Sequence, residues 1–423
     1  MSLAHSPVLP GMKFNTVQKP VKWNIPANVS LPENRKDLAF YSVLQLASLV
    51  KAKKITSVEL TQFFISRLKQ YSDSLQCVVS FTEDIAMQQA KQADKEIAAG
   101  KYRGPLHGIP YGLKDLFSVK GTKTTWGAEP YRNQIINEDA FVYTKLKNAG
   151  AVLVAKFTLG ALAMGDYWFG GRTKNPWNLQ YGSSGSSAGS ASATAAGLIP
   201  FAIGTETWGS IISPASTCGA TGLRPTFGSV SRSGAMALSW SLDKIGPICR
   251  SAADAAVVFN YIHGTDGLDA SAVDMPFNYT GKADLSRLKI AYAKNYFDKL
   301  DATSNDFKVL DVYRKLGVKL TPVTFPDSTV YNFDMMGIII GAESAAAFDE
   351  FTRGNEDDMM TRQTRFDWPN AFRGSRLIPA VEYINANRHR TILMQAVNTL
   401  PYWYCSYFLI FKHTIVITIR IQM

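Results

Sequence analysis

The chain has 423 residues, of which 46% are apolar, and its formal net charge is +11. A chain of this length and composition forms a large buried core, which excludes a small disulfide-stapled scaffold. Residues 1–70 hold ten Lys or Arg and three Asp or Glu, so +7 of the charge lies there. Because these cations form no continuous run, we interpret them as a solvated face and not as a binding surface for RNA or an anionic membrane.

The four cysteines, Cys77, Cys218, Cys249 and Cys405, show no C-x-x-C spacing and no neighbouring pair of histidines. We therefore expect neither a metal nor a redox motif, and no cofactor. Scattered cysteines in a long chain are typical of a reducing compartment, which makes a cytoplasmic location the expectation. Residues 1–30 lack a continuous apolar segment, so no secretory signal is expected, and no run of 18 apolar residues predicts a transmembrane helix.

The first helices are predicted from their capping residues. After an irregular lead over residues 1–36, Ser42 with Gln45 and Thr56 with Glu59 form two capping boxes, and each indicates a helix start. The next expected elements are a strand over 76–81, helices over 82–100 and 140–148, and a strand over 151–155.

Helical and extended patterns continue to alternate in the second half of the chain. The expected elements there are a helix over 187–196, strands over 198–203, 288–292 and 318–323, and a helix over 305–316. This alternation predicts an α/β fold whose sheet is covered on both faces, in one domain over residues 37–399. Residues 400–423 are apolar, β-branched and aromatic without turn or capping signals, and we interpret them as an atypical tail.

The first segment with chemical potential is Gly108-Ile-Pro-Tyr-Gly-Leu-Lys114-Asp115. It places a lysine at the end of a buried strand or turn. A lysine removed from water has a lowered pKa and can act as a neutral base. Taken alone, a surface lysine that pairs with Asp115 is the simpler interpretation.

The second segment, residues 182–190, contains five serines and three glycines. A flexible linker has such a composition, but this stretch leads directly into an Ala-rich helix and an apolar strand. A Gly/Ser loop at a helix start presents backbone N–H groups that suit an anion or an oxyanion. The third segment, residues 204–215, has a turn of small residues before Ser210, which is the layout that an acyl-transfer nucleophile needs.

A different nucleophile is also conceivable in the serine-rich segment. Gly185-Ser-Ser187-Ala-Gly189 matches the G-x-S-x-G pattern of nucleophile elbows. Ser187 would then be the nucleophile, and His263 or His389 would be its base. Because such a match arises easily by chance among serines, this signal is weak.

Together these segments resemble the amidase signature family. The core of that family is matched in order and spacing, over roughly residues 40–300, by the stretches 170–178, 182–190, 204–215 and 222–228. The resemblance implies a mixed central β-sheet covered by helices on both faces, and a Ser–cis-Ser–Lys triad.

The catalytic positions are carried over from the family motif residue by residue. The lysine falls on Lys114, the bridging serine with the cis peptide on Ser186, and the nucleophile on Ser210. The two serines are 24 positions apart, as in the family pattern. A register on Ser183 or Ser184 gives 27 or 26 and leaves too short an interval after Asn-Pro-Trp-Asn, so we reject it.

The resemblance also implies an oxyanion hole and residues that support it. The backbone N–H groups are those of Thr207, Trp208, Gly209 and Ser210, and the supporting side chains are Ser187 and Thr205. Two positions depart from the family pattern. Trp208 stands where glycine is frequent, and we expect it to narrow the acyl pocket. Ile212 stands where an arginine commonly pairs with the acid that matches Glu206, so the partner of Glu206 is left open.

The function implied is hydrolysis of the C–N bond of a small-molecule amide, without direct binding of nucleic acid; a homodimer is compatible with the sequence. One alternative is the glutaminase subunit of a tRNA-dependent amidotransferase, and another is a fatty-acid amide hydrolase. A third is an inactive family member with a binding or scaffold role. The last is motivated by the chain's end: the resemblance fades near Ala396, so we interpret the amidase domain as truncated.

Overall fold

The computed structural model describes residues 16–281, 284–285, 289–301, 303–326, 333–399, 406–411 and 414–419. The described chain divides into two compact units. The first holds residues 16–279 and 347–371, and the second holds residues within 280–346 and 372–419. No helix among the described residues is long and apolar enough to cross a membrane. Residues 16–34 of the predicted lead contain no helix or strand, and the domain boundaries proposed above stay a prediction.

A six-stranded mixed sheet forms the centre of the first unit, in the order β1-β3-β2-β8-β10-β9. The three strands β3, β2 and β8 are parallel, whereas β1, β10 and β9 pair antiparallel with their neighbours. This confirms the predicted fold class. The bounds are β1 (Val78–Phe81), β2 (Pro110–Lys114), β3 (Val152–Phe157), β8 (Ala202–Glu206), β9 (Thr221–Gly222) and β10 (Lys244–Cys249).

Burial along the central strands shows that both faces of the sheet are covered. Every residue of β2, β3 and β8 is buried, as expected where helices pack on either side of parallel strands. Pro110 is the first residue of β2, a position where a missing N–H costs the sheet little. The carboxyl ends of β2 and β8 consequently lie at one edge, inside the protein.

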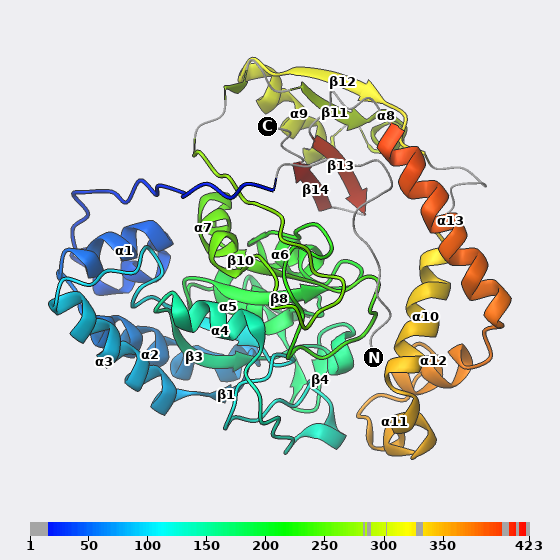
Figure 1. The fold of residues 1–423 in the computed structure, drawn as a ribbon, viewed down its shortest axis with the longest axis horizontal. Coiled ribbons are helices and arrows are strands. Elements are labelled where there is room, and N and C mark those ends of the chain that lie inside the picture. Colours follow the sequence, from blue (N-terminus) through cyan, green and yellow to red (C-terminus); the bar gives the residue numbers. More distant parts are fainter. Residues whose placement is uncertain are drawn as a thin grey trace. The chain divides into compact units, whose positions relative to one another are not determined.

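Seven α-helices come from the part of the chain that forms this sheet. Figure 1 shows α1 to α3 gathered near β1 and β3, and α7 beside β10. The helix α2 packs on α5 and the sheet, and α4 packs on α7 and the sheet. Their bounds are α1 (Val43–Lys51), α2 (Ser57–Leu75), α3 (Glu83–Ala98), α4 (Phe141–Asn148), α5 (Ala188–Ala195), α6 (Ile212–Cys218) and α7 (Ala252–Ile262).

Both predicted capping boxes are present. The Ser42 hydroxyl accepts from the N–H of Gln45, and the Thr56 hydroxyl accepts from the N–H of Glu59. In each pair the longer side chain accepts from the backbone N–H of the capping residue. Each box thereby satisfies N–H groups that a helix start leaves without partners, which fixes where α1 and α2 begin.

The strand predicted over residues 198–203 is wrong in position, because β8 runs from Ala202 to Glu206. Gly197 has a φ of +65° and ends the turn after α5, and residues 198–200 form bends. Leu198 and Ile199 are nevertheless buried. These two side chains make the segment apolar, although its backbone is not extended. The strand β8 instead includes Thr205 and Glu206, which we had interpreted as part of a turn.

Smaller elements complete the described chain. Residues predicted as strands over 288–292 and 318–323 pair as the parallel strands β11 (Lys289–Ala293) and β12 (Lys319–Val323). The remaining strands are β4 (Tyr167–Trp168), β5 (Gly171–Arg172), β6 (Lys174–Asn175), β7 (Asn178–Gly182), β13 (Ser406–Phe411) and β14 (Thr414–Ile419), which pair as three antiparallel hairpins. The rest of the predicted tail lies outside the described residues.

Helices after residue 290 and short 3-10 turns account for the rest. The predicted helix over 305–316 is confirmed as α9 (Asn305–Lys315). The others are α8 (Lys294–Phe297), α10 (Met335–Ala347), α11 (Asp349–Arg353), α12 (Trp368–Ser375) and α13 (Ala380–Thr399), with 3-10 turns η1 (Arg35–Phe40), η2 (Glu129–Tyr131), η3 (Ala161–Ala163) and η5 (Glu356–Met359).

Candidate active site

Lys114 is the last residue of β2, and it is completely buried. Its Nζ donates to Ser186 Oγ at 2.7 Å and to Thr205 Oγ1, on the neighbouring strand β8, at 2.8 Å. Burial lowers the pKa of Lys114 from 10.5 to about 7, although the carboxylates of Asp243 and Glu206 favour its charged form. The surface ion pair with Asp115 is therefore absent at this lysine, and Asp115 instead pairs with buried Lys156 at 2.9 Å.

The serine loop ahead of α5 brings Ser186 to the lysine. The Gly185–Ser186 peptide bond is cis, at the position that the family resemblance implies. The next residue, Ser187, joins this loop to the strand β8, because its hydroxyl accepts from the N–H of Thr205 at 3.2 Å and donates to the Thr205 carbonyl at 3.1 Å. The N–H of Ser187 also donates to the carbonyl of Ser210 at 3.1 Å.

Ser210 lies in the turn between β8 and α6, and it is only 9% exposed. Gly209 has a φ of +93°, a conformation that a residue with a Cβ rarely adopts. Within the described part of the chain, no acceptor receives the backbone N–H of Trp208, Gly209 or Ser210. These three successive donors lie beside a hydroxyl and belong to the four N–H groups, 207–210, that the resemblance assigns to an oxyanion hole; that assignment stays a prediction.

Glu206 finds its partners in the backbone and in Arg224. Its Oε2 accepts from the N–H groups of Ile211 and Ile212 at 2.9 and 3.0 Å. Its Oε1 lies 3.6 Å from Nε of Arg224. Arg224 lies 18 positions after Glu206 in the chain. It is near the carboxylate that, in the family pattern, an arginine at the position of Ile212 commonly pairs with. No pattern in the sequence pointed to it, apart from its place in the matched stretch over 222–228.

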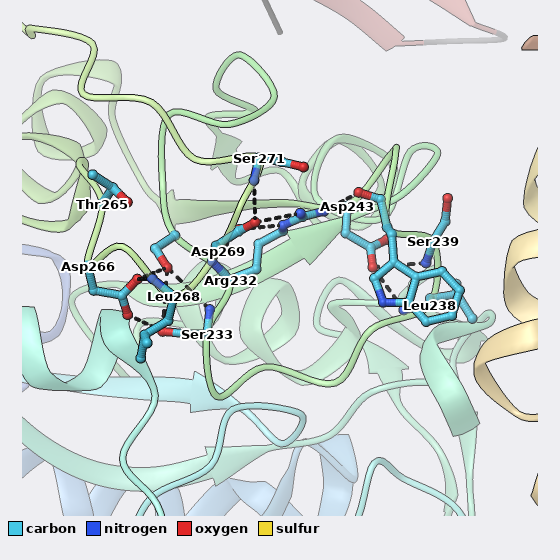
Figure 2. Close-up of polar contacts among 12 residues, drawn as sticks. Arg232, Ser233, Leu238, Ser239, Asp243, Thr265, Asp266, Leu268, Asp269 and Ser271 are labelled. Carbon is cyan, nitrogen blue, oxygen red and sulfur yellow. Dashed lines mark hydrogen bonds and ion pairs between the residues drawn. The ribbon is translucent and has the colours of Figure 1, made fainter. Parts of the chain in front are cut away.

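A cavity of about 210 Å³ adjoins Thr205 and Thr207. Its charged wall residues are held by partners in the chain: Arg232 Nε and Nη2 donate to Asp269 at 2.7 and 2.8 Å (Figure 2). The larger apolar side chains of the wall are Leu116, Met236, Leu238, Trp240, Ile245 and Leu268. Trp208, which we expected to narrow the acyl pocket, does not line this cavity, and 49% of it is exposed.

The alternative with Ser187 as nucleophile receives no geometric support. The hydroxyl of Ser187 bonds to the backbone of Thr205. The ring of His263 contacts the carbonyls of Phe259 and Asn260 through Nδ1, and Gln18 through Nε2. His389 lies exposed on α13.

No metal site is visible in the described ranges, where no three His, Cys, Asp or Glu side chains are grouped to hold an ion. Cys77, Cys218 and Cys249 are buried free thiols, and burial raises the pKa of Cys77 to about 12. Cys405 lies outside the described residues.

Comparison with known proteins places this chain in a family. The sequence model of the family described as Amidase matches residues 59–398. The A subunit of glutamyl-tRNA(Gln) amidotransferase from Carboxydothermus hydrogenoformans is 37% identical over 335 residues, which cover 76% of this chain and 68% of that protein. The corresponding protein of Coxiella burnetii is 41% identical over 262 residues, which cover 60% of this chain and 54% of that protein, so the chain spans about half to two thirds of these relatives.

Solved structures agree with the sequence comparison. The native peptide amidase from Stenotrophomonas maltophilia is 28% identical and superposes with a TM-score of 0.72, over 85% of this chain and 79% of that one. A family match across most of the chain, joined to the same fold in a solved amidase, confirms the resemblance inferred from the motifs. The chain belongs to the amidase family.

Proposed function

We propose that the chain hydrolyses the C–N bond of linear amides, with Ser210 as nucleophile, Ser186 as proton relay and Lys114 as base. The observation that carries this proposal is the 2.7 Å contact between Lys114 Nζ and Ser186 Oγ in a buried site. The lowered pKa of Lys114, about 7, supports it, because a large fraction of the lysine is then neutral near pH 7.

In the proposed acylation step, the three groups act in sequence. Ser210 Oγ attacks the amide carbonyl carbon and passes its proton to Ser186 Oγ, which passes its own proton to neutral Lys114 Nζ. A hydroxyl can do this because it donates and accepts at once. The developing oxyanion is stabilised by the N–H groups of residues 207–210. When the C–N bond breaks, the proton returns from Lys114 through Ser186 to the departing nitrogen.

Deacylation uses the same relay with water as the nucleophile. Water attacks the ester carbonyl of acylated Ser210, and its proton moves through Ser186 to Lys114. Collapse of the second tetrahedral intermediate releases the carboxylic acid and returns a proton to Ser210. We assign the acyl group to the cavity of about 210 Å³, because that cavity adjoins Thr205 and Thr207 and its wall combines apolar with polar and charged side chains.

A fluorophosphonate–rhodamine probe tests the nucleophile directly. The phosphorus–oxygen bond to Ser210 forms as fluoride leaves, so labelling is expected in the wild type and is lost in Ser210→Ala. Ser192→Ala is the matched control, since Ser192 is a buried serine of α5 whose hydroxyl donates to the Lys174 carbonyl at 2.8 Å. Equal labelling of Ser210→Ala and wild type would overturn the assignment. Absence of labelling in folded wild type would favour the inactive scaffold.

The substrate class is tested with a panel of aryl amides, amino-acid amides and L-glutamine. Hydrolysis of p-nitroacetanilide or of an amino-acid amide by the chain alone supports a free-standing amidase. Lys114→Met is expected to lower turnover about 10²- to 10⁴-fold, the usual contribution of a general base. Equal turnover in the wild type and in this variant would refute the role of the lysine.

A second candidate function is favoured by the names of two similar proteins. Two proteins that share 37% and 41% identity with this chain are glutamyl-tRNA(Gln) amidotransferase A subunits. We therefore also propose release of ammonia from glutamine by the same three residues, in company with partner subunits. Ammonia release from L-glutamine that appears only when the other subunits of such an amidotransferase are added would select this function over the free-standing amidase.

A further inference from the structure

Asp243 and Lys244 lie beside the candidate oxyanion hole but take no part in the proton relay. Lys244 begins β10, and in the antiparallel pairing of β10 with β8 it stands opposite Glu206, the last residue of β8. The turn that contains Ser210 starts at the next residue, Thr207. The sheet register therefore delivers two charged side chains to the first residue of the turn.

Both side chains bind Thr207, and they bind different groups of it. Thr207 Oγ1 donates to Asp243 Oδ1 at 2.5 Å, and Lys244 Nζ donates to the Thr207 carbonyl at 3.1 Å. The hydroxyl and the carbonyl of one residue are thus fixed by two consecutive residues from another part of the chain. Thr207 has little freedom to rotate while these contacts persist.

Asp243 and Lys244 are themselves held in place. Asp243 Oδ2 accepts from the N–H groups of Leu238 and Ser239 at 2.8 and 3.0 Å, as Figure 2 shows. Lys244 Nζ also donates to the carbonyl of Leu242. A support that is anchored on its far side can hold the turn at a defined position, which is what a preorganised site requires.

The contact from Lys244 also has an electrostatic consequence. The Thr207 carbonyl and the Trp208 N–H belong to the same peptide group. A cation bound at the carbonyl oxygen polarises that group and makes its N–H a stronger donor. The Trp208 N–H is one of the three donors that no acceptor in the described chain receives, so the polarisation is directed at the site beside Ser210.

We propose that Asp243 and Lys244 are positioning residues of the oxyanion hole: they fix Thr207, and the ammonium of Lys244 strengthens the Trp208 N–H as an oxyanion donor. This inference rests on the proposed function. Burial lowers the pKa of Lys244 only to about 8, so its charge is largely retained at pH 7, where Lys114 is partly neutral. The two lysines then serve one reaction in opposite protonation states.

The test is a set of Lys244 variants in which charge and hydrogen bonding are removed separately. Lys244→Met removes both, Lys244→Gln keeps a neutral donor, and Lys244→Arg keeps a cationic donor. We expect Lys244→Met to lower kcat about 10- to 100-fold on p-nitroacetanilide, less than the 10²- to 10³-fold known for loss of a whole oxyanion donor, with KM nearly unchanged. Lys244→Arg should recover part of the loss and exceed Lys244→Gln.

Thr207 gives a second arm to the same experiment. Thr207→Val loses the hydroxyl that Asp243 receives, whereas Thr207→Ser retains it, so kcat should fall in the first and stay near wild type in the second. The rate of phosphonylation of Ser210 by fluorophosphonate–rhodamine should follow the same order, since the phosphoryl oxygen uses the same donors. Lys294→Met is the control, because Lys294 is an exposed lysine paired with Asp298 on the surface.

Several outcomes would overturn the inference. A rise in KM at constant kcat in Lys244→Met would make Lys244 a substrate-binding residue. If Lys244→Met, Lys244→Gln and Lys244→Arg all lost kcat to the same extent and all had a lowered Tm, Lys244 would have only a structural role. Turnover that survives in Ser210→Ala would remove the proposed function itself, and that result is independent of the Lys244 series.

Discussion

Burial gives Lys114 both its chemical use and its energetic cost. The side chain has no exposure and is bonded to two hydroxyl groups, Ser186 Oγ and Thr205 Oγ1. Hydroxyl groups accept from an ammonium but do not neutralise it, so the charged form stays unfavourable in this site. The same environment that frees the lone pair of the lysine near pH 7 therefore lowers the stability of the folded protein, fully below about pH 7 and progressively less as the pH rises to 10.5.

The lowered pKa of Lys114 predicts an acid limb in the pH–rate profile. Because the base acts when it is neutral, kcat/KM should rise about tenfold per pH unit below about 7 and then flatten. The profile is measured with p-nitroacetanilide from pH 5 to 8. A kcat/KM that does not change over this range would contradict a lysine base with this pKa.

The same shift predicts a pH-dependent gain of stability in Lys114→Met. The folded pKa is about 7 and the unfolded pKa is near 10.5, so between these values the unfolded chain binds more protons and the stability of the wild type rises with pH. Methionine removes this dependence. Urea unfolding should therefore show a larger advantage of Lys114→Met at pH 6 than at pH 9, and a constant difference would argue against the shift.

At the scale of elements, β8 connects the parts of the site. It supplies Thr205 to the lysine, anchors Ser187 through its backbone, and ends at Glu206, which fixes the start of α6. Gly204 lets the serine loop approach, since a Cβ there would lie 2.7 Å from Ser187 Oγ and 2.9 Å from Ser187 Cβ. The closeness of loop and strand thus depends on one missing methyl group.

Gly204→Ala should disturb the site more than the fold. Displacement of Ser187 moves the N–H that holds the Ser210 carbonyl, so kcat/KM should fall at least about tenfold, as misplacement of reacting groups does. Gly337→Ala in α10 is the control, because a Cβ there meets nothing within 4 Å and alanine favours helix. Wild-type kcat/KM in Gly204→Ala would show that the loop tolerates the methyl group.

Element prediction succeeded at the helix starts, where local chemistry decides, and misplaced one strand whose extent is decided by tertiary pairing. The caps at Ser42 and Thr56 are local, and both helices begin where expected. The strand placed over 198–203 was misplaced because Leu198 and Ile199 are buried in bends, while Gly204 and Thr205 are extended only through the pairing of β8 with its neighbours. A short apolar segment predicts burial, but it does not by itself predict the backbone conformation.

At the scale of the whole molecule, the family and the mixed sheet were predictable because four spaced motifs had to match together. The contact between Lys114 and Ser186 could be predicted only through that resemblance, since 72 residues separate them. Arg224, Asp243 and Lys244 were not predicted. Their contacts to Glu206 and Thr207 depend on the register of β10 against β8 and on the path of β9, neither of which leaves a pattern in the sequence.

A late segment of the chain also stabilises the first unit. Trp368, 8% exposed, donates from Nε1 to the carbonyl of Leu162 at 2.9 Å, across 206 residues of sequence. Trp368→Phe should lower the free energy of unfolding by about 1–3 kcal/mol, because the buried carbonyl loses its donor. Trp177→Phe is the matched control: Trp177 makes a similar bond to the Cys218 carbonyl but is 76% exposed, so water can replace it. Equal losses in urea unfolding would contradict this reasoning.

The pairing of β2 with β8 sets an order of events during synthesis of the protein. Lys114 leaves the ribosome 91 residues before Thr205, and the serine loop emerges between them. Until β8 has been made, Lys114 lacks Thr205 and the strand that covers one side of β2, and an amine that water still reaches stays protonated. In a nascent chain without β8, we therefore expect Lys114 to have an ordinary pKa. It can act as a neutral base only after β8 has joined the sheet. Acquisition of activity would report the completion of the sheet and not the presence of the residues.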